Sequence, residues 1–194
     1  MFEYSNIPQM LYGIINNNPS KKIFHFKSDN KWESINGSDI IKTVESIACG
    51  LKSLGINKND KVAILSSTSY IWALCDYGII CNSSTTVTIY PTLIKRQVEF
   101  ILNNSESKVI FVENKEQSDK ILSIIKECNF IIKIIVMDDS GDYDNNLIIN
   151  YSDMIDIGSN YIINNNIHIE NEINLITGDD LLTLIYTSGT TVNL

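Results

Sequence analysis

Short apolar runs alternate with helical segments along residues 60–139, and this alternation limits the fold more than any other feature of the sequence. The apolar or β-branched runs, which predict buried strands, lie at residues 60–67, 85–92, 108–114 and 131–139. The intervening residues 69–81, 93–105 and 115–129 carry the apolar spacing of helices. Strands that alternate with helices at short intervals form a mostly parallel sheet with helices on both faces. The sequence therefore predicts an α/β fold.

The residues before this region predict a helix, a hairpin and a second helix. The first helix is expected at residues 7–16. Residues 21–35 alternate between apolar and polar side chains around the turn sequence Ser-Asp-Asn, which favours a β-hairpin with Phe24, Phe26 and Trp32 on packed faces. The second helix lies within residues 36–56, where Ser38 is the expected N-cap and Gly55 the expected C-terminal stop.

The net charge of −8 argues against a nucleic-acid partner, because proteins bind phosphates through Lys and Arg. The charge is uneven, since residues 134–194 hold 10 acidic residues and no Lys or Arg. Residues 138–180 are acidic and rich in Asn, and residues 151–162 are their one helical segment. We expect residues 138–180 to form a surface excursion of a single domain that spans residues 1–194.

The cysteines and histidines do not form the spacing of a metal site. The four cysteines make no C-x-x-C pair, and the two histidines are far apart in the sequence. We therefore expect no metal ligands and mostly buried, reduced thiols. The amino terminus lacks the pattern of a signal peptide, and no apolar run reaches the roughly 20 residues of a membrane span. These features predict a cytoplasmic protein and leave peripheral membrane contact open.

The last predicted strand lies at residues 181–186, and a loop of hydroxyl side chains and one glycine follows it. The loop residues are Thr187, Ser188, Gly189, Thr190 and Thr191. Glycine permits unusual backbone angles, and the amides and hydroxyls of such a loop can donate hydrogen bonds to phosphate at a strand end. Ser/Thr clusters also form ordinary turns. The loop matches neither G-x-x-x-x-G-K-[ST] nor G-x-G-x-x-G, so its composition leaves both interpretations open.

The full string DDLLTLIYTSGTT (residues 179–191) resembles the signature loop of adenylate-forming enzymes and the strand that leads into it. This family includes acyl-CoA synthetases, luciferases and peptide-synthetase adenylation domains. Residues 60–80, 97–114 and 151–158 resemble other segments of the family in the same order. The likeness runs from about residue 20 to residue 191.

One further segment is similar to long-chain acyl-CoA synthetases in particular. TVTIYPTL resembles their VPIYPT stretch, with Tyr90, Pro91 and Thr92 matching and Thr88 in place of proline. The chain also departs from the family, because Val192 stands where the signature continues with glycine and Pro-Lys-Gly does not follow. The family's adenine and ribose motifs and its C-terminal domain with the catalytic lysine are not among the 194 residues.

The resemblance implies an ATP-dependent, AMP-forming fatty-acid–CoA ligase. Such an enzyme joins a carboxylate to ATP, releases pyrophosphate, and transfers the acyl group from acyl-AMP to coenzyme A. The resemblance thus implies ATP, Mg²⁺ and coenzyme A as cofactors, nucleotide and fatty acid as ligands, and Thr187–Thr191 as a phosphate-binding loop. We expect this chain to be an N-terminal part of such an enzyme, with no catalytic residue of its own and no activity alone.

Three alternatives stay open. The chain is a piece of another adenylate-forming enzyme that activates acetyl, aryl or aminoacyl groups, or a nucleotide-binding module without chemistry, or an inert fragment of an interrupted gene. Other conspicuous residues have structural interpretations. Trp72 and Tyr77 are expected to pack in the core, and Thr92 to cap a helix. Asp179 and Asp180 are expected to lie in a solvated turn, and His25 to be structural.

Overall fold

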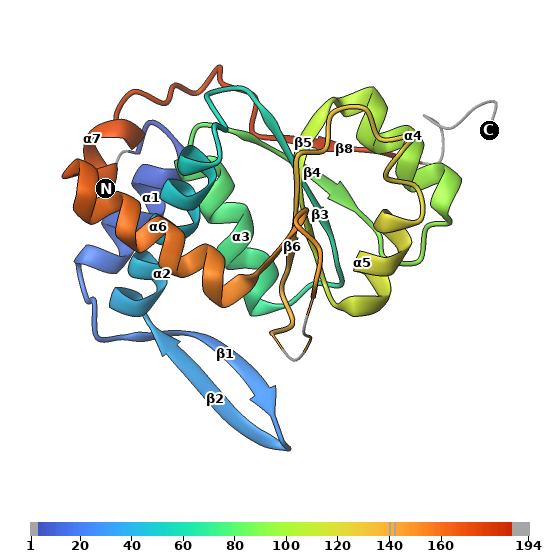
Figure 1. The fold of residues 1–194 in the computed structure, drawn as a ribbon. Helices are drawn as coiled ribbons and strands as arrows, with labels where there is room; N and C mark the ends of the chain where they lie inside the picture. Colours follow the sequence, from blue (N-terminus) through green and yellow to red (C-terminus); the bar gives the residue numbers. More distant parts are fainter. Residues whose placement is uncertain (1–3, 140, 142, 188–194) are drawn as a thin grey trace.

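The computed structural model describes residues 4–139, 141 and 143–187 of the chain. In these residues a central sheet lies between two layers of helices (Figure 1). The elements, in chain order, are α1 (Ile7–Asn16), β1 (Lys22–Ser28), β2 (Lys31–Asn36), α2 (Gly37–Ser53), β3 (Lys61–Leu65), α3 (Tyr70–Cys81), β4 (Thr85–Ile89), α4 (Lys95–Ser105), β5 (Ser107–Val112), α5 (Lys115–Leu122), β6 (Lys133–Val136), β7 (Ile148–Asn150), α6 (Tyr151–Asn165), α7 (Ile169–Ile173) and β8 (Thr183–Ile185). The α/β class and the parallel sheet predicted from the sequence are confirmed.

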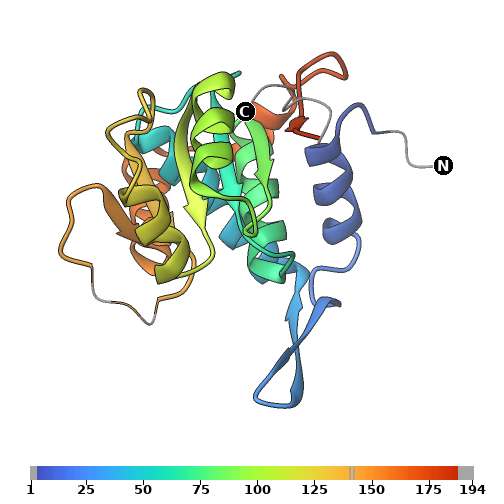
Figure 2. The same cartoon turned by 90° about the vertical axis from the view of Figure 1, so that its right-hand side faces the viewer.

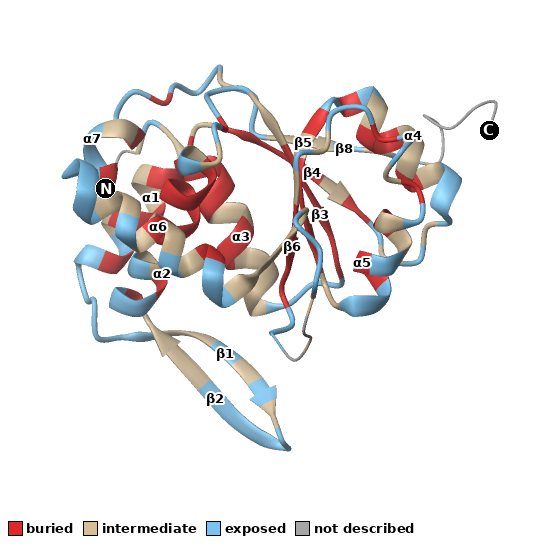
Figure 3. Cartoon of the chain, viewed as in Figure 1, coloured by how far each residue is buried: buried red, intermediate tan, exposed pale blue. Residues whose placement is uncertain are grey.

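The main sheet has the strand order β7-β6-β5-β3-β4-β8, and each neighbouring pair is parallel. Its central strands are buried on both faces (Figure 3). Val62 and Ile64 of β3 enter one hydrophobic core, whereas Ala63 and Leu65 enter the other. A strand that must fill two cores needs apolar side chains at every position, which explains why β3 is a continuous apolar run in the sequence.

The helices divide between the two faces according to the direction in which the sheet grows. The connections from β4 to β5 and from β5 to β6 run toward β7, and they place α4 and α5 over one face (Figure 1). The connection from β3 to β4 runs the other way and places α3 over the opposite face, together with α1, α2, α6 and α7. Right-handed crossovers produce this division.

Strands β1 and β2 form an antiparallel hairpin that projects from the α1–α2 side of the molecule (Figures 1 and 2). The two turn residues, Asp29 and Asn30, have φ of 47° and 62°. Two consecutive positive φ angles make a type I′ turn, which Asp and Asn tolerate better than other non-glycine residues. The hairpin and the turn predicted around these residues are confirmed.

Most predicted helices are present, but two N-caps were predicted wrongly. Helix α2 begins two residues earlier than a Ser38 cap would require, because the side chain of Asn36 accepts a hydrogen bond from the Asp39 amide at 2.9 Å. Thr92 does not cap α4, because residues 90–93 form a turn closed by the Leu93 amide and the Tyr90 carbonyl at 3.1 Å. The cap position of α4 falls on Ile94 instead.

The acidic residues 138–180 differ from the surface excursion that we expected. They contain the edge strand β7, the predicted helix α6 and the short helix α7, which the sequence pattern did not indicate. Met154 of α6 has no exposed surface and belongs to the core under α2. Apart from Ile163, the exposed residues of α6 are polar. A single buried stripe is enough to dock such a helix.

Glycine makes the contact between α6 and α2 close. A Cβ atom at Gly158 would lie 1.7 Å from the Ser46 carbonyl oxygen and 2.9 Å from the Gly50 nitrogen, both on the backbone of α2. No side-chain movement can relieve such a clash. The approach also allows the hydroxyls of Ser46 and Ser159 to meet at 2.9 Å.

We predict that Gly158→Ala lowers the free energy of unfolding by about 3 kcal/mol, because the two helices must separate to admit the methyl group. Urea denaturation monitored by circular dichroism measures this loss. Gly178→Ala is the matched control, because the nearest atom to its Cβ would be the Ser5 carbonyl oxygen at 3.8 Å. The control should change stability by less than about 0.5 kcal/mol. Equal effects of the two substitutions would contradict the proposed role of Gly158.

Candidate functional site

The candidate site lies at the carboxyl ends of β3, β4 and β8. The chain leaves β3 toward one face of the sheet and leaves β4 toward the other, so the two loops diverge and open a crevice. Ligands of open α/β sheets bind in such crevices. A hollow of about 430 Å³ occupies it, and its lining includes Ser66 to Thr68, Trp72, Thr88 to Thr92 and Ile185.

The loop after β3 supplies hydroxyl groups and is held in place by hydrogen bonds. The Ser66 hydroxyl donates to the Ser67 carbonyl at 2.8 Å, and the Ser67 amide donates to the Glu113 carboxylate at 3.0 Å. Ser69 then caps α3 by accepting a hydrogen bond from the Trp72 amide at 3.1 Å. This cap orients the first turn of α3, so the half-buried Trp72 lines the hollow as well as packing on the core.

The turn after β4 presents an aromatic ring and is fixed by a lysine. The side chain of Tyr90 is 68% exposed at the rim of the hollow. From α5, the Lys120 ammonium donates hydrogen bonds to the carbonyls of Pro91 at 2.7 Å and Leu93 at 3.2 Å. Removal of this group from water lowers the pKa of Lys120. The ammonium thus serves as a structural donor to the turn.

Strand β8 brings the end of the described chain to the same edge of the sheet. It pairs with β4 in parallel, with Thr88 opposite Ile185. The next residue, Tyr186, donates its hydroxyl to Asn104 at 2.7 Å, and its ring meets Phe100 edge to face at 6.4 Å between centroids. Tyr186 therefore anchors the backbone directly before the predicted loop.

Thr187 is the one predicted loop residue that the structure describes. It is exposed and lines a second hollow of about 440 Å³ together with Tyr90, Leu93 and Tyr186. Ser188, Gly189, Thr190 and Thr191 lie outside the described residues, so their part of the prediction stays a prediction. The described chain thus places the start of the loop beside the turn after β4.

Three residues of this region were not singled out in the sequence: Glu113, Lys120 and Tyr186. Each acts by holding a loop rather than by lining the first hollow, and no local pattern marks such a role. Tyr186 carried the clearest signal, because a tyrosine at the end of an apolar strand usually places its hydroxyl on a polar partner.

Asp180, predicted to lie in a turn, accepts hydrogen bonds from Thr177 and pairs with Lys58.

The donor set of the candidate site consists of hydroxyls and backbone groups rather than clustered metal ligands. Within residues 4–139, 141 and 143–187, no group of three or more His, Cys, Asp or Glu side chains is placed to hold a metal ion. Over the same residues, no helix combines the length and apolarity needed to cross a bilayer.

Comparison with known proteins shows what the chain is similar to. The family model described as "AMP-binding enzyme" matches residues 14–193. The long-chain-fatty-acid–CoA ligase FadD15 of Mycobacterium bovis is 26% identical over 189 residues, which cover 97% of this chain and 30% of that ligase. The fatty acyl-CoA synthetase A of Dictyostelium discoideum is 30% identical over 176 residues, covering 86% of this chain and 24% of the relative. The chain therefore spans less than a third of the length of these relatives.

Solved structures show the same fold. A long-chain-fatty-acid-CoA ligase (FadD1) from Archaeoglobus fulgidus superposes with a TM-score of 0.74 at 19% identity, over 96% of this chain and 36% of that one. The anthranilate CoA ligase AuaEII, solved with anthranoyl-AMP, gives a TM-score of 0.70 at 21% identity, over 80% and 29% of the two chains. At these identities the likeness establishes the fold.

We predict that Lys120→Met releases the turn after β4, because the carbonyls of Pro91 and Leu93 lose their charged donor. The expected cost is about 2 kcal/mol of unfolding free energy, with faster amide hydrogen exchange at residues 92–95. Lys115→Met is the matched control on the same helix, since its ammonium makes an exposed ion pair with Asp119 at 3.0 Å. The control should cost less than about 0.5 kcal/mol. Unchanged exchange in the turn of the Lys120 variant would refute the clamp.

Proposed function

The chain belongs to the AMP-binding enzyme family, and we propose that it forms the amino-terminal part of an ATP-dependent, AMP-forming fatty-acid–CoA ligase. In the proposed reaction a fatty-acid carboxylate attacks the α-phosphate of ATP, pyrophosphate leaves, and the thiol of coenzyme A then displaces AMP from the acyl-AMP. The names of the curated relatives and the Tyr90-Pro91-Thr92 sequence support a long-chain fatty acid as the acid.

The observation that carries the proposal is the pairing of β8 with β4. This pairing brings three connections to one sheet edge: the hydroxyl loop Ser66–Thr68, the turn Tyr90–Thr92, and the backbone that leads from Ile185 to Thr187. A nucleotide whose phosphates are held after β8 would lie against the other two. We therefore propose that Thr187, Ser188, Gly189, Thr190 and Thr191 begin the phosphate-binding loop.

This chain's own contribution is to bind and orient. Backbone amides and hydroxyls of the loop would donate hydrogen bonds to phosphate oxygens, and Tyr186 would fix where the loop starts. Both chemical steps develop negative charge on phosphates, which cations must stabilise. Residues 134–194 contain no Lys or Arg. Mg²⁺ belongs to the reaction of the family, but the described residues offer no cluster of metal ligands that would hold it.

A second candidate function is nucleotide binding without chemistry. It is favoured by the absence of Lys and Arg from residues 134–194, combined with the βα framework that precedes the loop. Both candidates place ATP at the same edge, and they differ in whether the bound nucleotide reacts.

We predict that the 194-residue chain has no ligase activity by itself. In an ATP–pyrophosphate exchange assay with palmitate, the chain should give no turnover above a protein-free background, because residues 134–194, which carry the loop, supply no Lys or Arg to stabilise the transition state. Exchange above background would refute this prediction. Isothermal titration with ATP in the same buffer then distinguishes a nucleotide-binding module, which releases or absorbs heat, from an inert chain.

The proposed ligase function itself is tested with a chimera. Residues 14–191 would replace the matching segment of the Mycobacterium bovis ligase, and the chimera would be assayed for palmitate-dependent exchange. Activity that is lost when Thr187, Thr190 and Thr191 are changed to valine, but kept with Ser20→Ala, an exposed serine whose hydroxyl donates a hydrogen bond to Asn18, would support the proposal. A folded chimera, verified by circular dichroism, that binds no ATP would count against it.

A further inference from the structure

The β1–β2 hairpin carries an exposed aromatic and basic face that neither the fold nor the proposed reaction uses. The hairpin stands away from the three-layered body (Figures 1 and 2). The prediction that Trp32 packs is wrong, because Trp32 lies near the tip of the hairpin, beyond the body, and is 71% exposed. Isolated exposed apolar residues are common on proteins. This tryptophan differs because of its position on a projecting element and because of the charges around it.

The pairing of the two strands shows which side chains share a face with Trp32. Residues opposite each other in an antiparallel pair point to the same side. The pairs His25–Ser34 and Lys27–Trp32 therefore form one outer face. The pair Lys22–Asn36 joins this face because the register shifts between Lys22 and Phe24. The ammonium of Lys27 lies 5.7 Å from the centre of the Trp32 ring, within the range of a cation–π contact.

The opposite face of the hairpin attaches it to the body. Phe24 and Ile35 pack against the core beside α1, α2 and α3. Phe26 stacks on Tyr70 at the start of α3, with 4.0 Å between ring centroids. These contacts fix the hairpin in one orientation, so the outer face stays directed away from the molecule.

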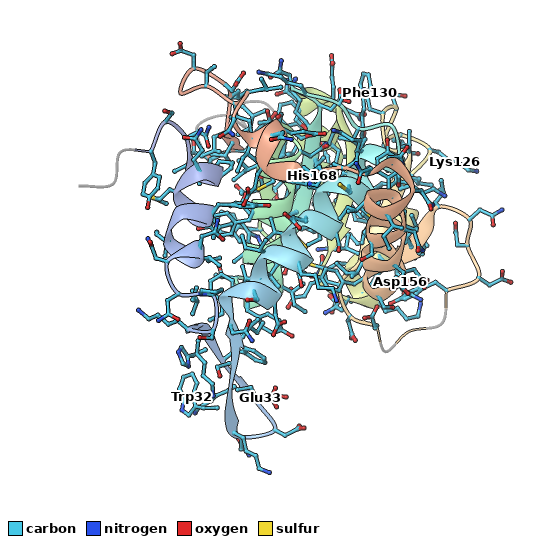
Figure 4. All side chains as sticks on the ribbon, turned by 90° about the vertical axis from the view of Figure 1, so that its left-hand side faces the viewer. Trp32, Glu33, Lys126, Phe130, Asp156 and His168 are labelled. Atoms are coloured by element: carbon cyan, nitrogen blue, oxygen red, sulfur yellow. The ribbon has the colours of Figure 1, made fainter. Side chains whose placement is uncertain are left out.

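The charge of the outer face is opposite to that of the protein. Lys22 and Lys27 lie on it, whereas exposed Lys31, opposite Ser28, belongs to the other face. The paired residues of this face include no acidic side chain, Glu33 projects to the side away from Trp32 (Figure 4), and exposed Asp29 lies in the turn at the tip. The chain as a whole has a net charge of −8. A local basic patch on an acidic protein restricts its partners to anionic ones that touch this patch alone.

We propose that the outer face of the β1–β2 hairpin docks the protein on anionic lipid bilayers. Tryptophan prefers the headgroup level of a bilayer, where its ring is buried and its N–H stays hydrated. Lysines beside it are attracted by anionic headgroups and can extend their ammonium groups toward them. The patch is small and its lysine side chains extend only a short distance from it, which suits contact with a planar surface. Binding in the grooves of a nucleic acid would require many more phosphate contacts.

The proposal does not depend on ligase activity, since docking needs only the folded hairpin. It concerns where the chain sits, whereas the proposed function concerns what its sheet edge binds. The two are therefore separable: a chain that binds vesicles but no ATP leaves the docking proposal intact, and the reverse leaves the proposed function intact.

The test is co-sedimentation of the 194-residue chain with phosphatidylcholine vesicles that contain or lack phosphatidylserine. We expect binding to the anionic vesicles, weakened by high salt because the lysine charges are screened. Each of Lys22→Gln and Lys27→Gln should lower the partition coefficient about fivefold, and Lys31→Gln on the other face should lower it less. Trp32→Ala should lower it by about tenfold. No binding, or equal binding to neutral vesicles, would overturn the proposal.

The matched control is the pair Lys126→Gln and Phe130→Ala, an exposed lysine and a 39% exposed phenylalanine far from the hairpin (Figure 4). This control should bind vesicles like the parent chain. Brominated lipids provide a second readout: in a Trp72→Phe background, Trp32 is the remaining tryptophan, and its fluorescence should be quenched on binding. Absence of quenching, self-association through Trp32, or binding of nucleic acid through the same lysines in place of lipid would each overturn the proposal.

Discussion

Burial of the central strands on both faces is the constraint on which the rest of the structure depends. Strand β3 sends alternate side chains into two separate cores, so a helical layer must cover each face of the sheet. The direction in which each neighbouring strand is added then decides which layer its helix joins. Because β3 and β4 are followed by helices on opposite faces, the loops after these strands separate. The crevice of the candidate site is therefore a direct consequence of having a helical layer on each face of the sheet.

The uneven charge of the chain has a structural counterpart. Acidic residues of the last third pair with lysines of the first third: Glu172 with Lys52 of α2, and Asp180 with Lys58 at 2.8 Å. Lys58 also holds the pKa of Asp180 below its usual range. Exposed ion pairs add little free energy. Their effect is to favour one placement of the segment that leads into β8. In the described chain, β8 is a short strand that pairs with β4 alone.

The sequence predicted the layers well because apolar periodicity reports directly on burial. Strands such as β3 and β5 were recognisable as continuous apolar runs, and α2 as a stripe of one face. The two wrong N-cap predictions have local causes. Asn36 instead of Ser38 caps α2, and a turn at Tyr90 moves the cap position of α4 beyond Thr92. Strand β7 and helix α7 escaped notice because each is too short to show a period.

The candidate site could be predicted only as far as one loop at the end of one strand. Which loops share the sheet edge follows from the strand order, and the pairing of β4 with β8 joins residues that are far apart in the sequence. The residues that hold those loops, such as Lys120 on α5, act across the same distances. Lys120 fits the amphipathic pattern of its helix like any surface lysine, and its role appears only when the Pro91 carbonyl is within hydrogen-bonding reach. A sequence pattern can therefore indicate a phosphate loop, but the geometry that would present it to a ligand is a property of the assembled sheet.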